Sequence, residues 1–245
     1  PAAAGARDAR DRSAGAPGAG PRAHPGEALS TGVVVATAVG VADAEGLAAL
    51  SMRRVAVELG VATMSLYRHV EDKDDLLLRM MDAAFDEWVP PARPVADWRG
   101  RVEHACQQMW DRFRRHPWLA PALSLTRPQA VAGGMVYSDQ VLAGLTELGM
   151  SPAAAFDTHL ILLNYVRGIA FSLDAEQQAE ADTGRTADEW VDDHEPDTRA
   201  ALGTRDLPAL RAVLDRLGTG GYDLDLDALF PVSYTHLTLP TSDLV

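Results

Sequence analysis

Apolar residues recur at three- and four-residue steps along most of the chain, which is the spacing of amphipathic helices. Val34, Ala38 and Val41 share one such face. Ser30 can cap the start of their helix, and Gly46 supplies a stop at its end. The sequence contains no long run in which apolar and polar residues alternate, as they would in a half-buried strand. The pattern therefore predicts an all-α protein.

Residues 51–75, which read SMRRVAVELGVATMSLYRHVEDKDD, predict two short helices joined by a tight turn. Ser51 caps the first helix, Met52–Leu59, and Gly60 permits a turn in which a side chain would clash or strain the backbone. The second short helix spans about residues 62–69. This order predicts a helix-turn-helix, whose second helix enters the major groove of DNA.

Longer helices are expected after this motif. The prolines at positions 90, 91 and 94 interrupt the helical pattern and mark a domain boundary. Residues 174–197 contain acidic residues opposed by Arg185 alone, and they are expected to form a mobile, solvated loop or a frayed helix. The longer helices are expected over residues 72–88, 97–116, 128–148, 151–174 and 206–217.

The expected organisation has four parts. Residues 1–28 consist mainly of Ala, Gly, Pro and Arg and are expected to be a disordered tail, although the arginines could also touch DNA. Residues 29–89 are expected to form the three-helix DNA-binding domain, and residues 95–230 a larger helical regulatory and dimerisation domain. Residues 231–245 do not continue the composition of the chain and are interpreted as a non-native or disordered tail.

The formal net charge of −13 requires any contact with DNA to come from a local basic surface. The single cysteine, Cys106, excludes a disulfide within the chain and is expected to be a small buried residue. No run reaches the roughly 18 apolar residues of a membrane helix, so a cytoplasmic protein is expected. His194 lies among acidic residues as in a chelating cluster, but solvation is favoured, and neither a metal nor a cofactor is expected.

Residues 42–77 are very similar to the DNA-binding domain of the tetracycline-repressor (TetR) family. The similarity rests on AEGL at 44–47, Leu-Gly-Val at 59–61, and Leu-Tyr-Arg-His at 66–69 followed by Lys73. Helix-turn-helix spacing alone would be weak support, but these elements occur together at the family's spacings.

The region from residue 102 to residue 174, including HPWLA at 116–120, resembles the helical regulatory domain of the same family less tightly. Together the resemblance covers roughly residues 30–217. It implies a homodimeric repressor that binds a double-stranded DNA operator without ligand and releases the operator when a small-molecule effector binds.

The resemblance also implies which residues contact DNA. Arg53 could pair with a guanine in a bidentate contact, typically worth about 1–3 kcal/mol of discrimination. Val33 stands where the family often has a charged residue, and Gly40 inside the first helix should cost it about 1 kcal/mol relative to Ala. The positions matching base-edge contacts are Arg53, Thr63, Met64 and Arg68, and those matching phosphate contacts are Ser51, Ser65, Tyr67, His69 and Lys73.

A ligand pocket is expected between helices of the regulatory domain, lined by apolar side chains with a few polar groups. Each apolar candidate could instead pack in the core. His159, Asn164 and Arg167 need partners if they are buried, and a ligand, the opposite subunit or the backbone could supply them. The candidates are Trp110, Phe113, His116, Trp118, Leu123, Met135, Leu142, His159, Leu163, Asn164 and Arg167.

Dimerisation is expected through a four-helix bundle made by the 152–174 and 206–217 helices of both subunits. In a two-fold dimer on a palindrome, the two recognition helices lie about 34–36 Å apart, one turn of DNA. The leading hypothesis is thus a ligand-responsive repressor. One alternative is a DNA-binding regulator controlled by a protein partner without a small-molecule inducer. A helical enzyme is remote, because no Ser-His-Asp set, phosphate loop or dinucleotide fingerprint occurs at motif spacing.

Overall fold

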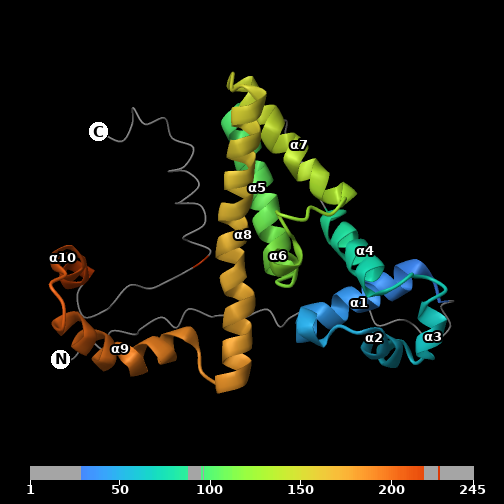
Figure 1. Ribbon diagram of the computed structural model, residues 1–245, viewed down its shortest axis with the longest axis horizontal. Helices are drawn as coiled ribbons and strands as arrows, with labels where there is room; N and C mark the ends of the chain where they lie inside the picture. Colours follow the sequence, from blue (N-terminus) through green and yellow to red (C-terminus); the bar gives the residue numbers. More distant parts are fainter. Residues whose placement is uncertain (1–28, 88–94, 96, 218–225, 227–245) are drawn as a thin grey trace, which may run out of the picture.

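The computed structural model describes residues 29–87, 95, 97–217 and 226, and all the regular structure in these residues is helical (Figure 1). The expected all-α class is therefore confirmed. The expected tails and the proline boundary at positions 90, 91 and 94 lie outside the described residues. The helices are α1 (Thr31–Glu45), the 3₁₀ turn η1 (Leu47–Ala49), α2 (Met52–Leu59), α3 (Thr63–Leu66), α4 (Lys73–Phe85), α5 (Trp98–Arg115), α6 (Leu119–Ala122), α7 (Ala132–Glu147), α8 (Pro152–Thr183), α9 (Ala187–Gly203) and α10 (Pro208–Leu217).

The smaller domain packs α1 against α2 and α4, with α3 held beside α2. Ser30 caps α1 by accepting a hydrogen bond from the Val33 N–H, and Gly46 ends it with a φ of 77° that only glycine adopts readily. The side chains that meet in the centre are fully buried, so this domain has a core of its own. They include Val34, Val55, Leu66, Leu76 and Met80.

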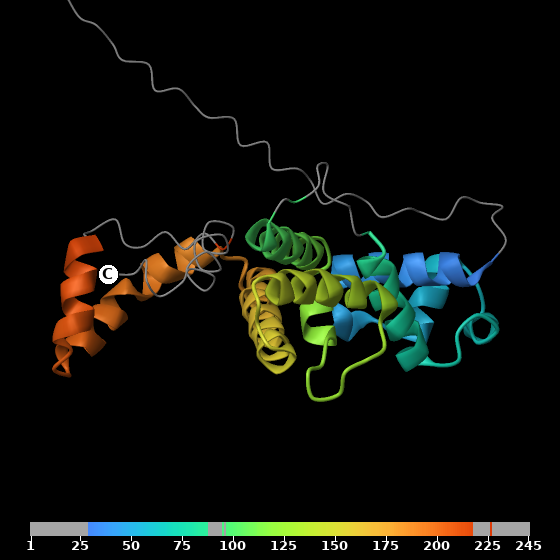
Figure 2. The same cartoon turned by 90° about the horizontal axis from the view of Figure 1, so that it is seen from above.

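The larger domain is built around α5, which packs on α7 and α8 (Figures 1 and 2). Val102, Trp110 and Phe113 form the buried face of α5. At Gly144 of α7 an added Cβ would lie 2.9 Å from Val102 Cγ2 and 3.0 Å from the Trp98 carbonyl oxygen. Glycine is therefore needed there, because the two helix backbones approach closely.

The two domains share one continuous core, which crosses between α4 and α7. A Cβ at Gly133 of α7 would lie 2.6 Å from the Cβ of Phe85 near the end of α4. In the same place the Gly133 N–H donates to the Asp82 carboxylate at 3.0 Å. The end of the smaller domain is thus fixed against the larger domain by both packing and hydrogen bonding.

Residues 174–197 were expected to form a loop or a frayed helix, and they are largely helical. α8 continues to Thr183 and α9 begins at Ala187, so the loop alternative is wrong. Gly184, with a φ of 67°, ends α8, and Thr186 opens α9 with a capping box that it shares with Glu189. Alanine and glutamate are strong helix formers, so the acidic composition did not prevent a helix. The other helices agree within a few residues, although α7 begins at Ala132 and not near residue 128.

α9 and α10 stand apart from the rest of the described chain, as both views show (Figures 1 and 2). Neither helix has a buried residue. We call residues 184–217 the C-terminal arm. Within the described residues, no helix is both long and apolar enough to cross a membrane, and this includes the 32-residue α8.

Candidate nucleic-acid interface

The helix-turn-helix is formed by α2, a sharp turn and α3. Ser51 caps α2 by accepting a hydrogen bond from the Arg54 N–H at 3.1 Å. Gly60 then adopts the left-handed conformation, with φ 66° and ψ 29°, and ends the helix. The Val61 N–H closes the turn by donating to the Ala56 carbonyl at 3.0 Å. Gly60 therefore adopts the left-handed backbone conformation that a side chain would strain, as the sequence predicted for this turn.

α3 is a single turn of helix that rests on a buried leucine. Leu66 is fully buried, and Val55, Ala56 and Val70 are buried with it. On the opposite side Met64 is 74% exposed and Tyr67 is 44% exposed. Met64 is a large apolar side chain that packing in the core does not explain. This segment is thus held firmly on one side and open on the other, as a helix that reads a groove must be.

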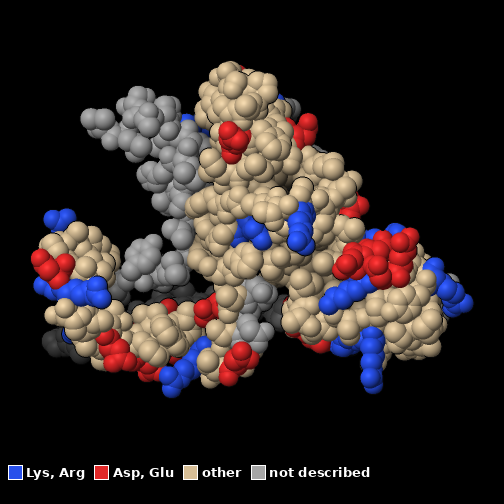
Figure 3. All heavy atoms as spheres, in the orientation of Figure 1, with Lys and Arg blue, Asp and Glu red and all other residues tan. Residues whose placement is uncertain are grey.

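The nine residues expected to contact DNA all lie outside the core. Figure 3 shows basic side chains projecting around the edge formed by α2 and α3, close to an acidic group. At the start of α4, Asp72 caps the helix by accepting from the Asp75 N–H at 2.8 Å. Exposed members of the set are Ser51, Arg53, Met64, Tyr67, Arg68 and Lys73, and half-buried members are Thr63, Ser65 and His69.

Arg53 and Arg54 are neighbours in the sequence but have different environments. The Arg54 guanidinium bonds to Glu45 at 2.5 Å and to Glu58 at 2.8 Å. These bonds raise the pKa of Arg54, and the bond from Arg54 lowers the pKa of Glu45. Arg53 is exposed and forms no ion pair among the described residues. Of the two, Arg53 is therefore the one available to an external partner.

The predicted pocket residues have different surroundings in the described part of the chain. Trp110 and Phe113 are core residues, and Met135 is 57% exposed. Asn164 is exposed and donates to the Leu160 carbonyl of its own helix at 2.9 Å. Arg167 donates to the Ala120 carbonyl at 2.7 Å. Trp118 is fully buried, and so are the polar side chains of His116 and His159 to within a few per cent. The half-buried members of the predicted pocket set are Leu123, Leu142 and Leu163.

Several polar side chains, including His159 of α8, lie in the interior of the larger domain. His159 Nε2 lies 3.0 Å from Ser138 Oγ, and its Nδ1 is buried without a hydrogen-bond partner among the described residues. Burial lowers the pKa of His159, which favours the neutral imidazole. The Tyr165 hydroxyl is likewise buried and unbonded in the described structure. Tyr165 was not predicted, although its place among apolar residues of α8 could have signalled it.

Two further side chains complete this interior region. Burial raises the pKa of Cys106 to about 12 and raises that of Tyr137 well above its ordinary value. Cys106 is therefore a protonated, buried thiol, as expected from the sequence. The Tyr137 ring lies 5.6 Å from the His159 ring.

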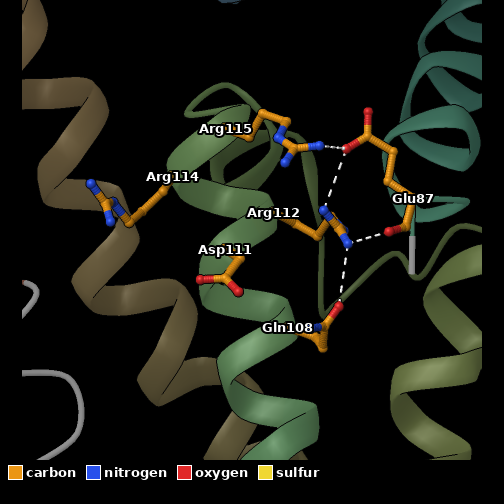
Figure 4. Close-up of a pocket in the computed structure, with 6 residues that line it drawn as sticks. All are labelled: Glu87, Gln108, Asp111, Arg112, Arg114 and Arg115. Carbon is orange, nitrogen blue, oxygen red and sulfur yellow. Dashed lines mark hydrogen bonds and ion pairs between the residues drawn. The ribbon is translucent and has the colours of Figure 1, made fainter. Parts of the chain in front are cut away.

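An open depression of about 480 Å³ lies on α5, and its lining includes none of the predicted pocket residues. Figure 4 shows Arg112 of α5 between Glu87, which follows α4, and Gln108. Arg115 pairs with the same glutamate. Bound in this way, Glu87 ties the DNA-binding domain to α5. Its role was missed from the sequence because nothing local marks a glutamate that bonds 25 residues away.

The sequence raised the question of a metal site, with His194 among acidic residues. No group of side chains suited to holding a metal ion occurs in the described ranges. His194 lies on α9, where its ring stacks on Trp190 with a centroid distance of 4.0 Å.

Comparisons with known proteins match both halves of the chain. Residues 34–80 match the family described as bacterial regulatory proteins, tetR family, and residues 90–233 match the tetracyclin repressor-like C-terminal domain. The HTH-type transcriptional repressor DrrR1 of Streptomyces coeruleorubidus is 34% identical over 210 residues, which are 84% of this chain and 75% of the relative. An HTH-type transcriptional regulator of Saccharopolyspora erythraea is 32% identical over 188 residues, which are 74% of this chain and 73% of the relative.

Solved structures agree. The TetR family protein ActR of Streptomyces coelicolor, in complex with actinorhodin, is similar with a TM-score of 0.63 and 29% identity over 84% of this chain and 93% of that chain. BioQ with its double-stranded DNA operator is similar with a TM-score of 0.54 and 25% identity, over 62% of this chain and 89% of that chain. The chain therefore belongs to the TetR family of bacterial regulatory proteins, which are DNA-binding transcriptional regulators and not enzymes.

Proposed function

We propose that this repressor reads its operator with α3 and the start of α2. The observation that carries the proposal is the exposed edge opposite buried Leu66, where Met64 is 74% exposed. Arg53 supports it further, because it is free of the carboxylates that occupy Arg54. Base edges are contacted by Arg53, Thr63, Met64 and Arg68, and phosphates by Ser51, Ser65, Tyr67, His69 and Lys73.

The dimer is formed by α8 and α10 of both subunits. One side of α8 packs on its own chain through Ala155, Leu162 and Val166. The other side exposes large apolar residues, Phe156 and Ile161 among them, and few charged side chains cover this part of the surface in Figure 3. Uncovered apolar area of this kind favours a self-complementary contact between two copies. The exposed apolar residues on α10 are Leu210, Val213, Leu214 and Leu217.

The effector is a small, largely hydrophobic molecule bound between α5, α7 and α8. Support comes from the buried His159 Nδ1 and Tyr165 hydroxyl, since unbonded polar groups in an apolar interior can be satisfied by a ligand. The similar protein ActR has been solved in complex with actinorhodin, so actinorhodin is the first compound to test.

Operator binding is tested with duplexes selected by the protein from a random pool. We expect the Arg53→Ala variant to lose preference at particular base pairs, by about 1–3 kcal/mol of discrimination. The matched control is Arg54→Ala, because its guanidinium is engaged by Glu45 and Glu58 and its loss should leave the base preference unchanged. An unaltered preference in Arg53→Ala would remove Arg53 from the readout.

The effector is tested by thermal shift with small hydrophobic compounds, beginning with actinorhodin. A compound that stabilises the free protein should also release it from the selected duplex. If no compound does either, and a protein partner releases the DNA, the regulator is controlled by that protein.

A further inference from the structure

The segment His116–Ala120 runs from the end of α5 into α6 and is bonded to the DNA-binding domain through Asp43 of α1. His116 Nδ1 lies 2.8 Å from Asp43 Oδ1, and the Trp118 indole N–H donates to the same oxygen at 2.6 Å. His116 is 4% exposed and Trp118 is fully buried. Both residues were expected in the ligand pocket, and here their polar atoms face the other domain.

The opposite side of the same segment is bonded to α8. The Arg167 Nε–H donates to the Ala120 carbonyl at 2.7 Å. The Arg167 guanidinium also lies over the Phe171 ring, 5.1 Å from its centroid. Five residues of chain are therefore held between α8 on one side and α1 on the other.

α1 carries this connection to the recognition segment. Asp43 lies near its C-terminal end, and Thr31 begins the helix. The Thr31 hydroxyl donates to the His69 carbonyl at 3.3 Å, immediately after the α3 turn. Twelve residues of helical rise separate Thr31 from Asp43, or about 18 Å. A hydrogen-bonded and packed route thus runs from α8, through Ala120 and Asp43, along α1 to the end of the recognition segment.

A second carboxylate of the DNA-binding domain, that of Glu87, also holds the end of α5 near His116. Glu87 pairs with Arg112 and Arg115, as Figure 4 shows, and its Oε1 lies 3.6 Å from His116 Nε2. The Arg112 side of this pairing is buried, whereas the Glu87 side chain is 38% exposed. A buried guanidinium left without its partner is costly, so Arg112 favours the arrangement in which Glu87 stays beside it.

We propose that Asp43 is the positioning residue through which the regulatory domain sets the recognition segment, with α1 as the lever between them. The inference rests on the proposed function, since it concerns how DNA binding and effector binding are coupled. A displacement of α6 or α8 that breaks the two bonds at Asp43 frees the C-terminal end of α1. The Thr31 end then no longer holds the His69 backbone in the DNA-reading position.

Coupling between two sites is reciprocal, so DNA itself serves as the probe. The experiment measures amide hydrogen exchange of the full chain with and without a duplex selected from a random pool. We expect DNA to slow exchange at the Leu119, Ala122 and Leu123 amides, which donate to carbonyls within the segment and α6. The expected slowing is about fivefold or more, the lower end of ordinary coupling between sites.

Two variants test the route and one serves as control. Asp43→Ala removes both bonds, and Thr31→Val removes the far bond while keeping the shape of the side chain. Either variant should bind DNA more weakly, and with enough duplex to saturate it DNA should protect α2 and α3 without slowing exchange at residues 119–123. Asp111→Ala removes an α5 carboxylate that accepts a hydrogen bond from Gln107 of the same helix, and it should keep the slowing. If Asp43→Ala fails to fold, Thr31→Val decides.

The outcomes separate the inference from the proposed function. If the unaltered protein binds no duplex, the proposed function fails and the inference fails with it. If DNA protects α2 and α3 but leaves residues 119–123 unchanged, the inference alone is wrong. If Thr31→Val keeps the full slowing at these amides, α1 is not the lever.

Discussion

The α2–α3 pair and the α9–α10 pair are both exposed helices, but they differ in what lies behind them. α2 and α3 present polar side chains together with Met64 outward and bury Val55, Ala56 and Leu66 inward. α9 and α10 have no buried residue at all. The first pair is a surface fixed by its own domain. The second is held by helix-internal bonds and leaves its apolar side chains for another molecule to cover.

The difference also separates two kinds of stabilisation. In α9 the bonds that hold the helix are local, such as the capping box of Thr186 and Glu189 and the ion pair of Arg199 with Glu195. Exposed pairs and caps of this kind each contribute about 1 kcal/mol or less. Buried leucines contribute several times more. Order in the C-terminal arm is therefore expected to depend on the second subunit.

The largest expected effect comes from the same substitution made in both pairs. Leu66→Ala should lower the free energy of unfolding by about 2–5 kcal/mol, because it empties a fully buried site. Leu210→Ala, at a position 47% exposed, should lower it by less than about 0.5 kcal/mol when the protein is dilute. Urea unfolding followed by circular dichroism measures both. Equal losses would show that the arm packs on its own chain.

Limited trypsin digestion should give the next largest effect. Arg205 lies exposed between α9 and α10, whereas Arg68 follows a helix anchored by Leu66. Cleavage after Arg205 should be at least about tenfold faster, because proteolysis follows local opening. Mass spectrometry of the fragments identifies the sites over time. Raising the protein concentration should slow cleavage at Arg205. Adding operator DNA should slow cleavage only at Arg68. If the cleavage rate at Arg205 does not depend on protein concentration, a dimer that covers the arm is excluded.

A smaller effect on DNA affinity is expected when one positive charge is removed from each of the two regions. Lys73 is exposed at the start of α4, where free backbone N–H groups also favour a phosphate. Lys73→Ala should weaken binding to all duplexes and reduce the slope of log affinity against log salt by about one. Arg205→Ala removes an equal charge from the arm and should leave the slope unchanged. A slope unaffected by Lys73→Ala would exclude a phosphate contact.

The sequence predicted the DNA-binding domain well because its signals are local. The Ser51 cap, the Gly60 turn and the apolar positions around Leu66 each specify their own neighbourhood within a few residues. The structure reproduces these elements, whereas contacts of the nine side chains with DNA remain a prediction. The same local rules also placed the starts of the helices expected at residues 97 and 151 in the larger domain.

The parts that were missed depend on contacts between distant residues. Asp43 bonds to residues 73 and 75 positions away, so no window of sequence shows why His116 and Trp118 face the DNA-binding domain. The acidic stretch was misjudged for another reason. Its charge predicted solvation, which is correct for α9, but a solvated segment can still be helical when caps and helix formers agree.

The smallest expected effect is a gain in stability at Gly40 of α1. A Cβ built there meets no atom within 4 Å, and the backbone is helical, so alanine fits without strain. Gly40→Ala should raise the free energy of unfolding by about 0.5–1 kcal/mol, because glycine loses more backbone freedom on folding. Differential scanning calorimetry measures the change.

Gly60→Ala is the matched control for this substitution. Gly60 also has open space around its Cβ position, but its φ of 66° strains any other residue. The control should therefore lose stability although neither change creates a contact. A gain at both positions would mean that backbone conformation does not decide the sign. A loss at Gly40 would mean that α1 must bend there, and a bending α1 could not act as the lever between Asp43 and Thr31.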